Sequence, residues 1–291
     1  MQEGYQVLLF YKYVTVEKPE RTANWLRGLA VRHQLLGRGI VAEEGINATF
    51  EGLTENTEKF AKEVLQNTLF ADMQIKRSAG MGHGFGKLSV KVRDEIVGTK
   101  FSPDEADPRV KTAPRISQQQ LKEWYQTNKD FVVVDMRNNY EFASGHFKNA
   151  VEPGINASRD LPSALSKLEP LKDKTVLTVC TGGVRCEKMS AYLQSHGFED
   201  VYQLDGGIHS YMEQYPGEDF LGTLYTFDRR LTMDFGGNRE VIGVCDFCNA
   251  KTERYVNCAN DTCHRHFLVC TNCIPLEDMP YCNDTCKVSV Q

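Results

Sequence analysis

The crowding of cysteines near the C-terminal end constrains the fold of this chain more than any other feature. Eight of its ten cysteines fall between Cys245 and Cys286, with the spacing C-x2-C-x9-C-x4-C-x6-C-x2-C-x8-C-x3-C. The same stretch contains few large aliphatic side chains. Because such a segment cannot bury an adequate hydrophobic core, we expect its fold to depend on bonds made by the cysteines.

Metal binding is the favoured use of these eight thiols. They form four close pairs, and eight thiolates complete two tetrahedral sites of four ligands each. Zinc fits best, because it takes four thiolates tetrahedrally and without redox chemistry. The predicted ligands are Cys245, Cys248, Cys258, Cys263, Cys270, Cys273, Cys282 and Cys286. The spacing fits consecutive and crossed pairing of the ligand pairs equally well.

Three alternatives stay open for the cysteine-rich region. His264 or His266 could replace a thiolate. Iron–sulfur clusters also use four thiolates. A disulfide knot would need an oxidising compartment, and the N-terminal sequence has no basic segment or small-residue cleavage site that predicts secretion. We therefore expect a cytoplasmic protein whose thiols are free or bound to metal.

Composition and length exclude several classes of protein. With 41% hydrophobic and 25% charged residues, the chain is not collagen, a coiled coil or a wholly disordered polypeptide. Its apolar runs fall far short of the roughly 20 residues that a membrane helix needs. A length of 291 residues predicts two or three domains. The expected divisions are an N-terminal domain over 1–101, a linker over 102–115, a central domain over 116–217 and a cysteine-rich region over 218–291.

The hydrophobic patterns predict two different domains before the cysteine-rich region. The first has the order β-α-β-β-α-β, which is typical of a ferredoxin-like α+β domain. In the second, short buried strands at 131–134, 175–179 and 201–204 alternate with helices, which predicts an α/β domain with a parallel sheet. Ligands of such sheets bind beyond the carboxyl ends of the strands, where Cys180 lies.

The segment C-T-G-G-V-R-C that begins at Cys180 is the strongest candidate for an active-site loop. It joins a predicted strand to a predicted helix, so backbone N–H groups and the helix N-terminus can converge on one point. This setting should lower the pKa of the Cys180 thiol and make it nucleophilic, while Arg185 adds a positive charge. The remaining loop candidates are Thr181, Gly182, Gly183, Val184 and Cys186. Cys186 either packs in the helix or resolves an oxidised Cys180.

The central domain resembles a rhodanese domain. The matching motifs are Val133-Val-Asp-Met-Arg137, Tyr140-Glu-Phe142, Gly145-His-Phe147, the Cys180 loop and Leu204-Asp-Gly-Gly-Ile208. The resemblance implies that Cys180 can carry a persulfide and that Asp135 and Arg137 brace the loop. We interpret Glu141 and His146 as structural.

Nearly the whole chain resembles the tRNA uridine-34 hydroxylase family. The further matching stretches are Glu43-Glu-Gly-Ile-Asn-Ala-Thr49, residues 87–97, Tyr225-Thr-Phe-Asp-Arg229 and Tyr255-Val-Asn-Cys-Ala-Asn260. The resemblance implies that wobble uridine in the anticodon loop of tRNA is converted to 5-hydroxyuridine, with O2 as co-substrate and Cys180 essential. We hypothesise that the thiolate adds to C6 of uracil. A persulfide or sulfenic acid on Cys180 is the alternative, and no flavin or haem motif is found.

A basic stretch in an acidic chain is the candidate tRNA contact. Residues 76–100 hold six Lys or Arg against two acidic residues, although the whole chain has a net charge of −5. The predicted contacts are Lys76, Arg77, Lys87, Lys91 and Arg93. A solvated strand face is the competing interpretation.

Two other functions compete with hydroxylation. A sulfurtransferase would pass persulfide sulfur from Cys180 to a thiophile or to tRNA. A non-catalytic RNA- or protein-binding module is disfavoured by the intact loop cysteine. A phosphatase is disfavoured too, because the loop between Cys180 and Arg185 is one residue shorter than in such enzymes.

Overall fold

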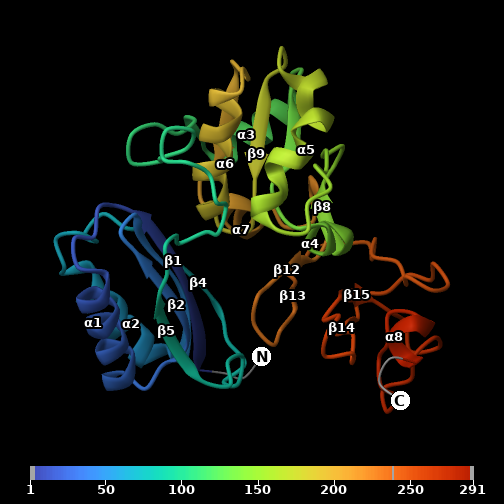
Figure 1. The fold of residues 1–291 in the computed structure, drawn as a ribbon, viewed down its shortest axis with the longest axis horizontal. Helices are drawn as coiled ribbons and strands as arrows, with labels where there is room; N and C mark the ends of the chain where they lie inside the picture. Colours follow the sequence, from blue (N-terminus) through green and yellow to red (C-terminus); the bar gives the residue numbers. More distant parts are fainter. Residues whose placement is uncertain (1–3, 238, 289–291) are drawn as a thin grey trace.

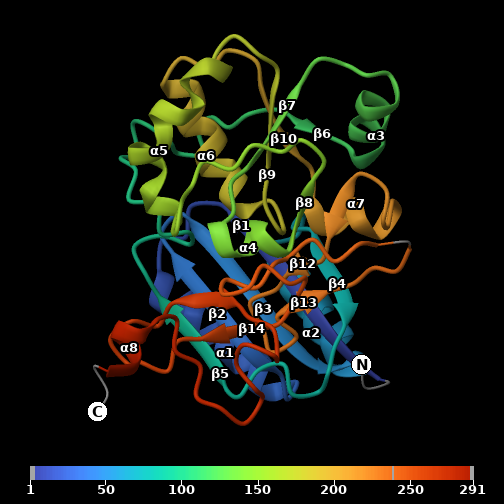
Figure 2. The same ribbon diagram turned by 90° about the vertical axis from the view of Figure 1, so that its right-hand side faces the viewer.

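A computed structural model describes residues 4–237 and 239–288. An N-terminal domain and a central domain lie next to each other, and the C-terminal extension runs back across both of them (Figures 1 and 2). No helix within these two ranges is long and apolar enough to cross a membrane.

The N-terminal domain is a five-stranded sheet with two helices on one face. Its strand order is β4-β1-β3-β2-β5. The elements are β1 (Tyr5–Tyr13), α1 (Pro19–Arg32), β2 (Leu36–Ala42), β3 (Gly45–Leu53), α2 (Thr54–Leu65), β4 (Ile75–Ala79) and β5 (Leu88–Val92). Alternate residues of β1 point to opposite faces, so Phe10 packs with Phe50 and Phe60 under the helices while Leu9 and Tyr11 face the central domain. The predicted ferredoxin-like order is confirmed, with β5 added in parallel to β2.

The first helix is shorter than its sequence pattern predicts. The helical pattern of the sequence runs over 20–36, but α1 ends at Arg32. Gln34 takes a left-handed backbone conformation with φ of 57°, which turns the chain into β2. The change of direction buries Leu35 in the core instead of extending the helical face.

The central domain is a parallel sheet with helices on both faces, as the sequence predicts. Its strand order is β6-β10-β9-β7, and every pair is parallel. The strands are β6 (Arg115–Ile116), β7 (Val132–Asp135), β9 (Val176–Val179) and β10 (Val201–Leu204). The helices are α3 (Gln118–Gln126), α4 (Asn139–Ser144), α5 (Leu161–Leu168), α6 (Val184–Ser195) and α7 (Gly207–Gln214). A separate hydrophobic cluster lies on each side of the sheet, which explains its unbroken apolar strands.

The C-terminal extension joins the other two parts. Its first strand, β11 (Phe220–Gly222), pairs with β8 (Gly145–Phe147) of the central domain. Next comes a hairpin, β12 (Leu224–Tyr225) and β13 (Thr232–Met233), whose tip reaches the N-terminal sheet (Figure 1). The cysteine-rich region follows with β14 (Tyr255–Asn257), β15 (His266–Leu268) and α8 (Asp284–Val288).

Candidate active site

The loop that begins at Cys180 connects the carboxyl end of β9 to the first residue of α6. Gly183 is the residue before the helix and has φ of 101°, a conformation that side-chain-bearing residues rarely adopt. Its backbone N–H donates a hydrogen bond of 3.2 Å to Sγ of Cys180. Gly207 packs directly against this loop. A Cβ on Gly207 would lie only 2.5 Å from the carbonyl oxygen of Cys180. Glycine is therefore required at both positions to fold the loop around the thiol.

Cys180 is fully buried, yet its surroundings favour the thiolate. Burial by itself raises the pKa of Cys180, but a hydrogen bond from the Cys186 thiol, the charge of Arg185 and backbone N–H groups outweigh it and lower the pKa to about 6. Burial raises the pKa of Cys186, and the neighbouring Cys180 raises it further. The two thiols thus divide into a nucleophile and a protonated hydrogen-bond donor.

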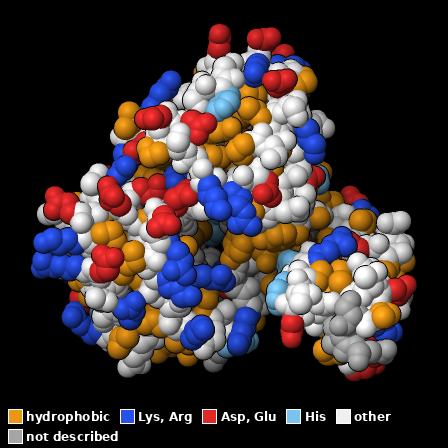
Figure 3. All heavy atoms as spheres, in the orientation of Figure 1, with side chains coloured by type: hydrophobic (Ala, Val, Ile, Leu, Met, Phe, Trp, Pro, Cys, Tyr) orange, Lys and Arg blue, Asp and Glu red, His pale blue; other side chains and the backbone are white. Residues whose placement is uncertain are grey.

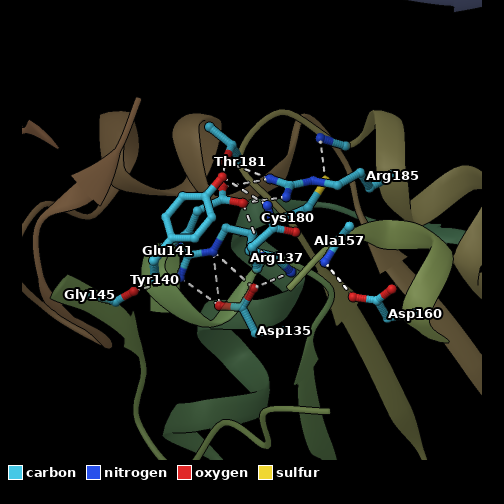
Figure 4. A network of polar contacts seen from close by, with 12 residues as sticks. Asp135, Arg137, Tyr140, Glu141, Gly145, Ala157, Asp160, Cys180, Thr181 and Arg185 are labelled. Atoms are coloured by element: carbon cyan, nitrogen blue, oxygen red, sulfur yellow. Dashed lines mark hydrogen bonds and ion pairs between the residues drawn. The ribbon is translucent and has the colours of Figure 1, made fainter. Parts of the chain in front are cut away.

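Arg185 is held by a buried carboxylate rather than left free at the rim. Its two terminal nitrogens donate to the Glu141 oxygens at 2.6 and 2.8 Å, and one also reaches Oγ1 of Thr181 at 3.2 Å (Figure 4). A second buried pair lies beneath, where Arg137 donates to Asp135 at 2.6 Å. Both pairs fix the loop from the side of α4. The resemblance to rhodaneses implies this bracing for Asp135 and Arg137, whereas the bidentate contact of Glu141 has no signal in the sequence spacing.

The Cys180 loop forms one wall of the site, and the open face of the N-terminal sheet forms the second. A Cβ on Gly182 would lie 2.9 Å from Cδ2 of Leu9, and one on Gly183 would lie 2.8 Å from the hydroxyl oxygen of Tyr11. The Tyr11 hydroxyl donates to Glu187 of α6 at 3.1 Å. The two glycines of the loop therefore serve close packing between domains as well as the turn itself.

A buried lysine locks the two domains together. Lys188 of α6 forms ion pairs of 2.7 Å with both Glu44 and Glu95 of the N-terminal domain. Its side chain is only 4% exposed. Because a buried charge is stable only when it is paired, this contact holds α6 against the N-terminal domain.

The tip of the β12–β13 hairpin supplies the third wall. Arg38 of β2 donates to the carbonyl oxygen of Phe227. The N–H of Arg229 donates to the carbonyl of Gly84 at 3.0 Å. Arg230 pairs with Asp228 at 2.6 Å and also donates to Ser78 Oγ at 3.0 Å. Although this segment lies far along the chain, its hydrogen bonds attach it to the first domain.

A cavity of about 410 Å³ lies where these three walls meet. This volume is within the ordinary range for a small-molecule or nucleobase site. Its lining includes Leu9, Tyr11 and Arg38 from the sheet, Cys180, Thr181 and Arg185 from the loop, and Phe227, Asp228 and Arg230 from the hairpin. The loop of Cys180 therefore faces a chamber that no single domain could build.

The eight cysteines of the extension gather in two groups of four. The groups are Cys245, Cys248, Cys270 and Cys273, and Cys258, Cys263, Cys282 and Cys286. The first sequence pair therefore joins the third and the second joins the fourth, which is the crossed arrangement. None of the cysteines within the described ranges forms a disulfide. His264 and His266 belong to neither group, and His266 instead stacks on Tyr255.

The sulfur positions fit a tetrahedral metal ion. Within each group the ligand atoms lie within 4.8 Å of one another. Neighbouring sulfur atoms lie 3.6 Å apart for Cys248 and Cys270 and 3.7 Å apart for Cys263 and Cys282. A tetrahedron with metal–sulfur bonds of about 2.3 Å requires roughly 3.8 Å between sulfur atoms. Both clusters can therefore hold a metal ion, and neither leaves an open position for a substrate.

Comparisons with known proteins cover all three parts of the chain. Residues 5–96 match the family described as "UPF0176 acylphosphatase like domain", residues 117–214 match "Rhodanese-like domain" and residues 221–287 match "Rhodanase C-terminal". A tRNA uridine(34) hydroxylase of Staphylococcus aureus is 41% identical over 91% of this chain and 84% of its own length. The chain belongs to the tRNA uridine(34) hydroxylase family. A relative of the same name from Bacillus velezensis is 40% identical over 99% of this chain and 90% of its own.

Solved structures are similar to parts of this family member. A rhodanese-like domain protein from Staphylococcus aureus is 30% identical and covers 34% of this chain and 90% of its own, with a TM-score of 0.30.

The five basic residues predicted as tRNA contacts separate into three places in this family member. Lys76 lies in register with Leu9, so its buried side chain faces the loop, where its carbon chain approaches Gly206. Burial lowers the pKa of Lys76, and the charge of Cys180 opposes the change. Arg77 points to the helix face and pairs with Glu58 at 2.7 Å.

The other three basic residues share an exposed face of β5. Lys87, Lys91 and Arg93 alternate with the buried side of this strand. Lys91 lies in register with Ile40 of β2, which lines the cavity. This face therefore leads outward from the cavity, and Figure 3 shows Lys and Arg side chains around the hollow between the domains. Arg38 of β2 lies on this same face of the sheet. Its closeness to the basic residues of β5 becomes evident only from the pairing of β2 with β5.

Proposed function

We propose that this chain hydroxylates uridine 34 in the anticodon loop of tRNA, at C5 of the base, in the cavity above Cys180. The observation that carries the proposal is the placement of a thiol with a pKa of about 6 against a 410 Å³ chamber. The names of the relatives that match along nearly the whole chain support the choice of substrate.

The first chemical step needs only residues of this chain. The Cys180 thiolate adds to C6 of uracil and a C–S bond forms, while the π pair of the C5–C6 bond shifts to C4–C5 and the π pair of the C4 carbonyl moves onto O4. Backbone N–H groups of the loop and the Glu141-bound Arg185 guanidinium stabilise the resulting negative charge. C5 thereby becomes nucleophilic enough to react with an oxidant.

Oxygen insertion then consumes one O2 molecule, two electrons and two protons. O2 supplies the oxygen atom of the new C5 hydroxyl group, and the second oxygen atom leaves as water. A thiol reductant supplies the two electrons and two protons that form this water. Release of the C6–S bond with loss of the C5 proton restores the aromatic base and the free thiolate.

The tRNA backbone lies along the exposed face of β5 in this proposal. Lys87, Lys91 and Arg93 are exposed there and lead toward Arg38 at the cavity. Bases of the anticodon loop are single-stranded, so the base at position 34 can leave the stack and enter the cavity. We further propose zinc in the two cysteine clusters and a cytoplasmic location, where tRNA and reduced thiols are both available.

Nucleoside mass spectrometry after incubation with tRNA and a thiol reductant tests the proposal. Incubations under air, nitrogen and 18O-labelled oxygen gas are run with the wild type and with Cys180→Ser. Labelled oxygen should enter uridine only with the wild type, and we expect a loss of roughly a thousandfold in the variant. If no oxygen enters but thiosulfate and cyanide give thiocyanate, the protein is a sulfurtransferase, the activity that its rhodanese domain would favour.

Binding to a labelled anticodon stem-loop tests the basic face separately. The triple change of Lys87, Lys91 and Arg93 to Gln should weaken binding. It should also reduce the steepness of log affinity plotted against log salt concentration by about three, one for each lost phosphate contact. Arg77→Gln is the matched control, because its charge lies on the opposite face of the sheet and is paired with Glu58. Equal binding by the triple variant and the wild type would place the tRNA elsewhere.

A further inference from the structure

An exposed aromatic ring stands at the cavity beside the loop of Cys180. Phe227 lies at the tip of the β12–β13 hairpin, is 43% exposed and lines the cavity. Its ring centre is 5.7 Å from Cζ of Arg185. The catalytic chemistry described above makes no use of this side chain. A large apolar ring held open to solvent next to a charged site is typical of a surface that binds a planar partner.

Contacts on the ring and on the hairpin backbone hold Phe227 in place. Tyr225 packs edge-on against Phe227, with ring centres 5.3 Å apart and planes at 83°. The carbonyl oxygen of Phe227 accepts a hydrogen bond from Arg38 of the first domain. On the far side of the tip, the N–H of Thr226 donates to the carbonyl of Leu231 at 2.8 Å. The ring is therefore positioned before any ligand arrives, which reduces the entropy lost on binding.

The charges around the ring suit a nucleotide rather than an apolar ligand. Arg185 and Arg230 are both paired with carboxylates, so their guanidinium groups are already engaged and are not free to bind a phosphate. Arg38 has no carboxylate partner among the residues that the structure describes, and its guanidinium lies 5.8 Å from the ring centre of Phe85. A stacking ring next to one uncompensated guanidinium matches a base with its phosphate.

We propose that Phe227 is the stacking platform for the target base, so that the C-terminal extension supplies a binding residue to the active site of the other two domains. This inference rests on the proposed function, because it assigns a role within the same cavity. Stacking acts on binding and not on the chemistry of C5. Its loss should therefore raise KM more than it lowers kcat.

The test compares the two phenylalanines that are exposed in the described part of the chain. Phe227→Leu should raise KM for an anticodon stem-loop about tenfold and leave kcat nearly unchanged, as expected for one lost stacking contact. Phe227→Tyr keeps the ring and should restore the KM. Phe247→Leu is the matched control, since Phe247 is 47% exposed but lies in the cysteine-rich region. The rate of Cys180 alkylation, equal in all variants, verifies that the loop is intact.

A fluorescence measurement separates this inference from the proposed function. A stem-loop with 2-aminopurine at position 34 should be quenched on binding to the wild type and to Phe227→Tyr, but much less with Phe227→Leu. Quenching by the wild type without hydroxylation of the natural stem-loop would overturn the proposed activity and retain the platform. Hydroxylation by the wild type with the same KM and quenching in Phe227→Leu would overturn the platform alone.

Discussion

The Cys180 loop and the cysteine-rich region use the same side chain for opposite purposes. In the loop, one thiol is surrounded by amide groups, glycines and a buried ion pair. In the cysteine-rich region, the thiols gather in two groups of four, and those of Cys245 and Cys258 also accept hydrogen bonds from backbone N–H groups. The role of a cysteine thus follows from the groups that surround its sulfur atom. The α/β core favours the thiolate of a single cysteine, whereas the two groups of four in the cysteine-rich region can each hold a metal ion.

Removal of the metal ions should have the largest effect, and it should affect the cysteine-rich region but not the Cys180 loop. Structural zinc sites contribute roughly 10–16 kcal/mol to folding in small domains, so a strong chelator should unfold residues 245–286 and leave the central domain folded. Limited trypsin digestion with mass spectrometry, combined with metal analysis, measures the effect. Cys180→Ser is the control and should still bind two ions per chain. A cysteine-rich region that stays protected after complete metal loss would contradict the structural role of the clusters.

Loss of the Glu141 carboxylate should have the next largest effect. Glu141→Gln leaves the Arg185 guanidinium buried without a charged partner, which should lower the free energy of unfolding by about 3–5 kcal/mol. Urea denaturation measures this loss. Glu58→Gln removes the partner of Arg77 in an ion pair that is nearly half exposed, and it should change the stability by no more than about 1 kcal/mol. Equal losses in the free energy of unfolding for the two variants would mean that the buried Glu141–Arg185 pair stabilises the fold no more than the exposed pair does.

The pH dependence of alkylation should distinguish the loop thiol from an ordinary one. Only the thiolate reacts with iodoacetamide, so the rate at Cys180 should rise with pH through a midpoint of about 6 and be nearly constant above pH 7. Peptide mass spectrometry follows the reaction at this site alone. A midpoint above pH 8, where free cysteine ionises, would show that burial outweighs the hydrogen bonds and the Arg185 charge.

The smallest expected effect concerns the neighbouring thiol. Cys186→Ala removes the hydrogen bond that this thiol donates to Cys180, so the pH midpoint of Cys180 alkylation should shift upward. The fold should survive, because the change removes a single buried sulfur atom. By contrast, Cys270→Ala should release metal from its cluster. An unchanged midpoint in Cys186→Ala would assign the lowered pKa to Arg185 and the loop amides.

Local structure around Cys180 is largely predictable from the sequence. The predicted strand before Cys180 and the helix after it are both present as β9 and α6. The turn between them depends on Gly183, whose conformation is a property of a few neighbouring residues. The ferredoxin-like order of the N-terminal strands is predictable for the same reason, because hydrophobic alternation is a local pattern.

Contacts between distant segments are not predictable in this way. Glu141 and Arg185 are 44 residues apart, and Arg38 and Phe227 are 189 apart. Arg77 illustrates the same limit, because the sequence groups it with Lys76 although the two point to opposite faces of β4. Charge counted along a chain does not tell which face of a sheet will carry it.

The candidate loop at Cys180, the folds of the first two domains and the number of thiolates available for metal are all evident from the sequence. Each of these depends on residue types and on spacing between neighbours along the chain. The tertiary structure alone decided the crossed grouping of the cysteines, the pairing of Arg185 and the chamber above Cys180. The physical reason is that these features depend on how elements pack and pair across domains, and packing brings together residues whose separation in sequence carries no signal.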